Sequence, residues 1–199
     1  MEIIPTSVSD KYLISQGYNL LNRVRCSRVI DLVNKIDKEK TVIKRDIDWK
    51  GFYQTLVENK ILEEFNGLER IPKKIVFQAD LIKKLNLIKS HSSDGYFTVQ
   101  DYFLEEQFIE GKCYDYQQLS TNEEQKLIDL VKTFHNASYF RLDIRKGSNF
   151  ILTPKGELYL VDLGSFIKKR GRFFNNYRKE DLKELDELLK KSTHVKGVM

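Results

Sequence analysis

The order of the hydrophobic patterns along the chain limits its fold more than any other feature of the sequence. Up to about Lys44, short runs rich in β-branched and aromatic residues are separated by Gly and Asn, which is typical of antiparallel strands. These runs span residues 12–21, 27–33 and 40–44. From Trp49 to Leu68 the apolar positions recur mostly at helical spacing, so we expect one helix to follow these strands.

A second set of strands is indicated before the middle of the chain. Residues 75–77 and 96–106 have strand-like composition, and the basic stretch 81–95 between them is typical of a hairpin connection or loop. We expect a boundary near residues 109–112, because the pattern changes there.

The second half begins with a clear helix signal. Thr121 followed by Glu124 forms a capping box in front of an amphipathic run. Residues 150–164 then predict a hairpin with the Pro-Lys-Gly sequence as its turn, and a charged helix is expected at 179–191. We therefore expect an α+β protein of two parts, residues 1–108 with an antiparallel sheet and one helix, and residues 109–199 with mainly helices.

The composition fits a globular protein, since 41% of the residues are apolar and 12% are aromatic. The formal net charge of +5 attracts anions mildly but does not distinguish nucleotides, nucleic acids and membrane surfaces. Cys26 and Cys113 have no CxxC spacing, so we expect neither a zinc site nor a disulfide framework. The first residues lack a basic segment followed by an apolar stretch, and no window approaches the roughly 18 to 20 apolar residues of a spanning helix. We therefore expect a cytosolic protein without a transmembrane segment.

Polar residues at defined spacings between His135 and Gly164 indicate a chemistry. Phosphoryl transfer from ATP needs a carboxylate that orients the acceptor hydroxyl, oxygen ligands for Mg²⁺ and a cation on the phosphates. His135 lies eight residues before Asp143, and Asn149 lies thirteen residues before Asp162. In these spacings the segment resembles the catalytic loop and the Asp-Phe-Gly element of the protein-kinase-like superfamily, with Asp162 as the Asp of that element.

This resemblance implies a two-lobed protein-kinase-like fold with a truncated C-terminal lobe, and ATP-dependent kinase activity. Asp143 resembles the catalytic Asp, and Asn149 and Asp162 resemble the residues that hold Mg²⁺, an ion that prefers such oxygen ligands. Taken singly, Asp162 could instead belong to an ordinary turn and Asn149 could cap a loop. His135 is expected to be a structural residue bonded to backbone near the loop rather than a proton shuttle.

The first half resembles the same superfamily around Lys44. The strand that ends there is similar to the Val-Ala-Ile-Lys motif of the family's third strand, which implies that Lys44 binds the α and β phosphates of ATP. Glu58 lies where the family's helix carries the partner of this lysine, with Glu63 and Glu64 as alternatives.

The resemblance extends to the connection between the two parts and fails in the glycine-rich loop. Residues 103–112 resemble the hinge that pairs with adenine, which implies that Gln107 and Ile109 act through backbone groups. No G-x-G-x-x-G sequence precedes Lys44, and the region contains Gly17 with several arginines, among them Arg23. Phosphate binding would then depend on arginine side chains in place of glycine backbone.

Few residues follow the Asp-Leu-Gly sequence, as in the bacterial lipopolysaccharide core heptose kinases and the RIO-like atypical kinases, which the chain resembles in this respect. The implied acceptor is a hydroxyl of protein Ser/Thr or of a sugar such as a lipopolysaccharide core residue. The alternatives are a pseudokinase or nucleotide-binding scaffold module without turnover and, more distantly, a nucleic-acid-binding protein. The basic segment 167–179 is a candidate surface for an anionic partner, or a solvated segment with none. Four leucines of the last helix are expected to pack into the core through one face, Leu182, Leu185, Leu188 and Leu189.

Overall fold

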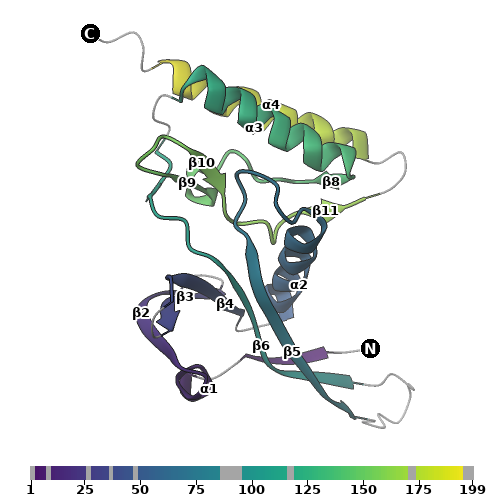
Figure 1. Cartoon of the computed structure of the whole chain (residues 1–199). Helices are drawn as coiled ribbons and strands as arrows, with labels where there is room; N and C mark the ends of the chain where they lie inside the picture. Colours follow the sequence, from purple (N-terminus) through teal and green to yellow (C-terminus); the bar gives the residue numbers. More distant parts are fainter. Residues whose placement is uncertain are drawn as a thin grey trace. The chain divides into compact units, whose positions relative to one another are not determined.

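The computed structural model describes residues 3–7, 10–25, 28–35, 38–46, 49–85, 96–115, 119–169 and 174–194. The chain forms two compact units, Met1–Asn66 with Lys73–Phe108 and Gly67–Pro72 with Ile109–Met199 (Figure 1). The predicted boundary lies at the same residue, 109, whereas residues 67–72 were predicted to belong to the first part and belong to the second unit. Among the described helices none is long and apolar enough to cross a membrane.

The first unit is built on a six-stranded sheet. Its strands are β1 (Ile3–Ser7), β2 (Tyr18–Arg25), β3 (Arg28–Lys35), β4 (Thr41–Asp46), β5 (Lys74–Leu85) and β6 (Tyr96–Gln107). The order is β1-β6-β4-β3-β2, and β5 also pairs with β6. Strands β1 and β4 pair with successive parts of β6, residues 97–102 and 104–107, and β5 pairs along residues 96–106 on the opposite edge. The pairing of β1 with β6 is parallel, and the other pairings in this sheet are antiparallel, as expected for β2, β3 and β4.

Two helices belong to the first unit. The predicted helix after the first strands is confirmed as α2 (Trp49–Glu64), which ends four residues before Leu68. The expected strand at residues 12–21 is wrong in its first part, because α1 (Asp10–Ser15) occupies it. Leu13 of α1 is buried with Tyr18, Val33 and Ile43 in one apolar cluster, so this short helix is stabilised by packing on the sheet.

The strand β5 continues well beyond the predicted residues 75–77, to Leu85. Register shifts interrupt its pairing with β6, for instance between Gln78 and Asp80. The remaining residues of the predicted connection, 86–95, lie outside the described part of the chain.

The second unit consists of two long helices with small sheets. Its elements are β7 (Lys112–Cys113), α3 (Thr121–Asn136), β8 (Tyr139–Phe140), the 3-10 turn η1 (Gly147–Asn149), β9 (Phe150–Leu152), β10 (Leu158–Leu160), β11 (Ile167–Lys168) and α4 (Phe174–His194). The helices α3 and α4 lie side by side (Figure 1), and Leu119 before α3 donates a backbone hydrogen bond to Ser192 Oγ of α4 at 2.9 Å.

The predicted hairpin is confirmed in the second unit. Strands β9 and β10 pair with Phe150 opposite Leu160, and Gly156 in the turn between them has a φ of 78°, which suits glycine. Strand β7 pairs with β9 on its other edge. Gly111, directly before β7, lies close to the backbone of β9. A Cβ at this position would be 2.4 Å from the carbonyl oxygen of Leu152.

The helix ends differ from the expectation. Ser120, not Thr121, is the N-cap of α3, and its side chain accepts the backbone N–H of Glu123 at 3.2 Å. The last helix begins at Phe174 rather than 179, and residues 170–173 of the basic segment lie outside the described part.

The leucine face of α4 is only partly confirmed. Leu185 and Leu188 are buried, whereas Leu182 is 43% exposed and is no core residue. The two buried leucines share the core of the second unit with the apolar face of α3, including Leu130 and Phe134. Both units are thus mixtures of helices and mainly antiparallel strands, and the protein belongs to the α+β class.

Candidate functional site

Lys44 of the first unit is buried on the face of β4 that packs against α2. Its Nζ lies 2.8 Å from Glu58 Oε1 on α2 and 2.6 Å from Glu106 Oε1 on β6. All three side chains are buried. The expected pairing of Lys44 with Glu58 is therefore present, and the alternative Glu63 pairs with Lys74 instead.

Glu106 is a second partner of Lys44 that was not predicted from the sequence. Strand register explains its position, because Lys44 pairs with Leu104 and Val42 with Glu106, so Glu106 is the diagonal neighbour of Lys44 on the same face. When ionised, the three side chains carry one positive and two negative charges. A phosphate that binds Lys44 consequently competes with a carboxylate that already holds the ammonium group.

The opposite face of β4, together with β3 and β2, carries a second set of ion pairs. Arg23 donates to Asp31 at 2.6 Å and to Asp10 at 2.8 Å, and Arg45 contacts the same two carboxylates. The two carboxylates raise the pKa of the Arg23 guanidinium above its ordinary value, through hydrogen bonds to Asp10 first and Asp31 second. Arg23 therefore serves the fold of the first unit, and it is a poor substitute for a phosphate-binding glycine loop.

The two residues predicted to bind adenine belong to different units. Gln107 is near the end of the first unit, and Ile109 begins the longer segment of the second unit, Ile109–Met199. The backbone N–H of Gln107 donates to the carbonyl of Lys73 at 2.8 Å, and its side chain accepts the N–H of Lys73 at 3.3 Å. The N–H of Gln107 is thus used within the first unit. The adenine contact stays a prediction, and for Gln107 it is confined to the carbonyl group.

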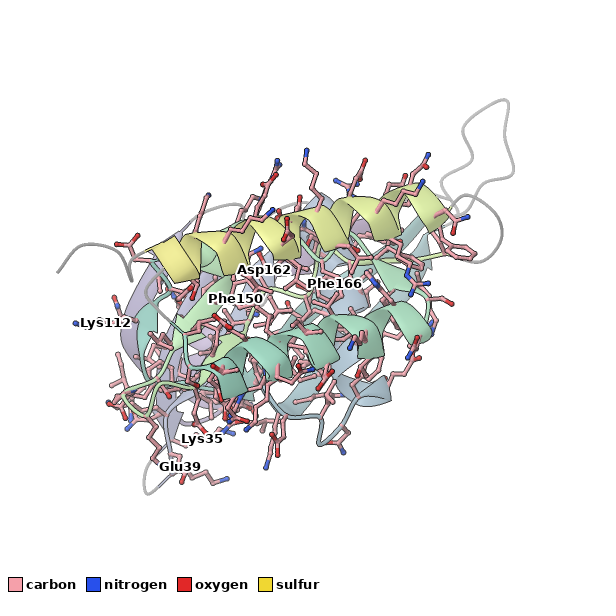
Figure 2. The ribbon with its side chains drawn as sticks, turned by 90° about the horizontal axis from the view of Figure 1, so that it is seen from above. Lys35, Glu39, Lys112, Phe150, Asp162 and Phe166 are labelled. Atoms are coloured by element: carbon pink, nitrogen blue, oxygen red, sulfur yellow. The ribbon has the colours of Figure 1, made fainter. Side chains whose placement is uncertain are left out.

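In the second unit, hydrogen bonds bring three predicted residues into one loop system. Asn149 is buried, and its Nδ2 donates to the backbone carbonyl of Asp143 at 3.1 Å. The carbonyl of Asn149 accepts the N–H of Val161 at 2.8 Å, so Asp162 follows directly after a residue bonded to Asn149. In the view of Figure 2, Asp162 lies between the ribbons of α3 and α4, near Phe150 of β9.

Two carboxylates of α4 hold the chain around Asp143. Asp181 Oδ1 accepts the N–H of Leu142 at 2.9 Å, and its Oδ2 accepts the N–H of Arg141 at 3.1 Å. Glu184, one turn further along α4, accepts the N–H of Ile144 at 3.1 Å. Burial raises the pKa of Glu184 above its ordinary value, and the nearby charges of Asp143 and Asp181 act in the same direction.

His135 also contacts Asp181. Its Nε2 lies 3.0 Å from Asp181 Oδ2, and its ring stacks on Phe140 at 5.3 Å between ring centroids. The expectation of a structural histidine fits this contact, although its side chain meets a carboxylate rather than the backbone. Asp181 and Glu184 were not predicted from the sequence, where their only signal is a spacing of three residues on one helix face.

The loop held in this way is strained. Arg141 and Asp143 have φ values of 58° and 51°, in the left-handed region that residues other than glycine rarely adopt. Such conformations cost about 1–3 kcal/mol each and persist where surrounding contacts over-determine them, often at functional sites. The bonds from α4 to residues 141, 142 and 144 supply those contacts.

Asp143 lines an open hollow of about 520 Å³ within the second unit. The hollow is lined by the loop around Asp143, by Ser165 and by the exposed side of α4, and every lining side chain is polar or charged. Lys146 Nζ lies 2.5 Å from Asp143 Oδ2, so a cation already accompanies the proposed catalytic carboxylate.

The residues near the loop fit a magnesium ion chemically. Because the Asn149 amide nitrogen donates to the chain, its Oδ1 is the atom left to bind a cation, and Asp162 adds a carboxylate. In the part of the chain that the structure describes, no group of three His, Cys, Asp or Glu side chains is placed to hold a metal. A metal here would therefore depend on the amide oxygen of Asn149, the carboxylate of Asp162 and oxygens of a substrate.

Two comparisons with known protein sequences identify no relative. The chain matches none of the family models against which it was compared, and no curated protein sequence.

Proposed function

We propose that the chain is an ATP-dependent kinase of two-lobed protein-kinase-like fold with a reduced C-terminal lobe. The observation that carries the proposal is the bonded arrangement of Asp143, Asn149 and the residue before Asp162. The buried pair of Lys44 with Glu58 supports it, since Lys44 lies on β4 and Glu58 on the helix that follows. A cytosolic location, where ATP and Mg²⁺ are available, is part of the proposal.

The proposed reaction is transfer of the γ-phosphoryl group of ATP to a hydroxyl. The acceptor oxygen attacks the γ-phosphorus, the bond from that phosphorus to the β–γ bridging oxygen breaks, and ADP leaves with the bridging oxygen. The hydroxyl proton passes to the Asp143 carboxylate, which also orients the hydroxyl. Lys146 Nζ lies 2.5 Å from Asp143 Oδ2, so the acceptor hydroxyl would share this carboxylate with the ammonium group.

The remaining residues bind and position the nucleotide. Lys44 would bind phosphate oxygens, with Glu58 fixing the direction of its ammonium group. Asn149 and Asp162 would hold Mg²⁺, which neutralises phosphate charge when bound. Ile109 and the carbonyl of Gln107 would contact adenine.

The test is transfer of labelled γ-phosphate by the full chain into a cell extract that is then separated into protein, lipid and small-molecule pools. Asp143→Ala is expected to abolish transfer while leaving Mg·ATP binding largely intact, whereas Asp162→Ala is expected to impair Mg·ATP binding. Asp129→Ala, an exposed change on α3, is the control. Full transfer by Asp143→Ala would remove Asp143 from the role of base.

The second candidate is a nucleotide-binding module without turnover. The ion pairs of Arg23 favour it, because they remove a cation that could have replaced the missing glycine-rich loop. Binding of Mg·ATP without transfer to any pool of the extract is the outcome that this candidate predicts.

A further inference from the structure

We infer that the hollow beside Asp143 binds a small hydroxylated acceptor that carries an anionic group, with Arg141 binding the anion. The inference rests on the proposed function, because it assigns the acceptor class of the same site. Its volume of about 520 Å³ lies within the roughly 300–1,000 Å³ of small-molecule sites.

The lining disfavours an apolar ligand. None of the side chains around the hollow is aliphatic or aromatic, so an acyl chain or a hydrophobic peptide side chain would contact only the stems of polar and charged side chains there. The loop contributes arginine and lysine, and α4 contributes carboxylates, so a ligand with both acceptors and donors of hydrogen bonds is complementary to it.

Arg141 is the cation of the hollow with capacity for a ligand. Lys146 contacts Asp143, Arg145 lies 3.6 Å from Glu184, and Lys183 lies 3.9 Å from Glu187. For the guanidinium of Arg141 the described residues provide neither a hydrogen bond nor an ion pair, and the residue is exposed.

The position of Arg141 is nevertheless fixed. Its backbone N–H is bonded to the buried Asp181, and its left-handed φ sets the direction in which the side chain leaves the loop. Because the backbone is held, binding an anion would order only the side chain. A guanidinium binds phosphate or carboxylate through two parallel hydrogen bonds, which gives orientation as well as affinity.

The rest of the hollow suits hydroxyl groups. The Oγ of Ser165 is buried without a hydrogen-bond partner, although it lines the hollow. Glu180 on α4 is exposed, and the described residues offer its carboxylate no partner. Together with Asp143, Glu180 can bind hydroxyls of one ligand while the anionic substituent lies at Arg141.

The test measures equilibrium binding to the full chain without nucleotide, by calorimetry. Three probes are of one size class, glucose 6-phosphate, glucuronate and glucose, and inorganic phosphate and a Ser-containing peptide serve as comparisons. The phosphate and carboxylate probes separate two sources of the same anionic chemistry. Arg141→Asn is the variant, since asparagine tolerates a left-handed φ, and Arg178→Asn on the exposed side of α4 is the control.

At least one anionic sugar is expected to bind about tenfold or more tightly than glucose, and Arg141→Asn is expected to weaken that binding by about ten- to a hundredfold, as for loss of a charge-assisted hydrogen bond. Arg178→Asn and wild type should bind alike. Equal binding of glucose and the anionic sugars, an unaffected Arg141→Asn variant, or inorganic phosphate binding as tightly as glucose 6-phosphate would each overturn the inference. Tighter binding of a Ser-containing peptide than of any sugar would overturn it as well.

Failure of this inference and failure of the kinase proposal can be told apart. Binding is measured without ATP, so an inactive protein that binds anionic sugars through Arg141 supports the acceptor site and contradicts turnover. An active kinase whose affinity for sugars is unchanged in Arg141→Asn supports turnover and contradicts the acceptor site.

Discussion

The charge of Lys44 contributes to the stability of the fold, whether or not a ligand is bound. Its ammonium group is shared by two buried carboxylates, Glu58 and Glu106. A buried charge that loses its partner is strongly destabilising, because its desolvation is no longer offset. The Val-Ile-Lys sequence and the helix after it allowed Lys44 and Glu58 to be predicted. Glu106 could not be, since its place depends on the register of β4 with β6.

Lys44→Met is therefore expected to lower the free energy of unfolding by about 3–5 kcal/mol. Glu106→Gln should cost far less, because the Lys44–Glu58 pair remains and the number of buried negative charges falls by one. Lys40→Met, an exposed change in the same unit, should stay within about 0.5 kcal/mol of wild type. Urea unfolding followed by circular dichroism measures all three, and equal losses for Lys44→Met and Lys40→Met would contradict the argument.

Asp10 links pH to the stability of the first unit. Hydrogen bonds from Arg23 above all, and from Arg45, lower the pKa of Asp10 from 3.8 to about 2. Because the pKa is lower in the folded state, the stabilisation by Asp10 is present above about pH 4 and is lost as the pH falls towards 2. The Asp10 side chain is 54% exposed, so solvent screening limits the effect to about 1 kcal/mol or less.

Asp10→Asn should therefore be slightly less stable than wild type at pH 6 and equally stable near pH 2. Unfolding free energies measured across this range test the expectation. A difference that stays constant from pH 6 to pH 2 would show that the charge of Asp10 contributes nothing to it.

At the scale of the elements, α4 does more than pack on α3. Its buried leucines hold the helix in the core, and its carboxylates Asp181 and Glu184 bind the backbone of the strained loop. The hydrophobic spacing of α3, and the turn sequence between β9 and β10, made both elements predictable. The role of α4 could not be predicted, because the sequence does not distinguish the carboxylates of a charged helix that bind backbone N–H groups from those that are exposed to solvent. Helix α1 was misread because six residues are too few to establish a helical period.

Asp181→Ala is expected to destabilise the protein by about 3 kcal/mol or more, because two backbone N–H groups and a buried histidine lose their acceptor at about 1–3 kcal/mol each. Asp181→Asn keeps one acceptor oxygen and should lose less. The matched control is Asp186→Ala on the same helix, whose exposed pair with Lys190 should be worth about 0.5 kcal/mol at most.

Amide hydrogen exchange separates the anchoring role from a general loss of stability. In Asp181→Asn, the N–H of Leu142 should exchange faster by a larger factor than the N–H groups in the middle of α3. Uniform acceleration over the second unit would instead show that Asp181 contributes only to global stability.

At the scale of the whole molecule, the chain leaves the first unit at Gly67, returns at Lys73 and leaves again at Ile109. Arg70 in the short crossing is tied to the second unit by ion pairs with Glu123 at 2.9 Å and Glu157 at 3.1 Å. The division into two parts was predictable from the change of hydrophobic pattern. This crossing was not, since no local pattern shows that residues 67–72 pack with a helix some fifty positions later.

The kinase proposal requires that residues of both units contribute to binding of the nucleotide. If one nucleotide is bound by residues of each, then Lys44→Met in the first unit and Asp162→Asn in the second should each weaken Mg·ATP binding by about ten- to a hundredfold, the loss of one charge-assisted contact. Equilibrium dialysis at a temperature where circular dichroism shows each variant folded measures this. Lys40→Met and Asp129→Asn are the exposed controls in the two units. Weakening by only one of the two variants would assign the nucleotide to a single unit, and the proposed transfer to a hydroxyl at Asp143 would then lose its physical basis.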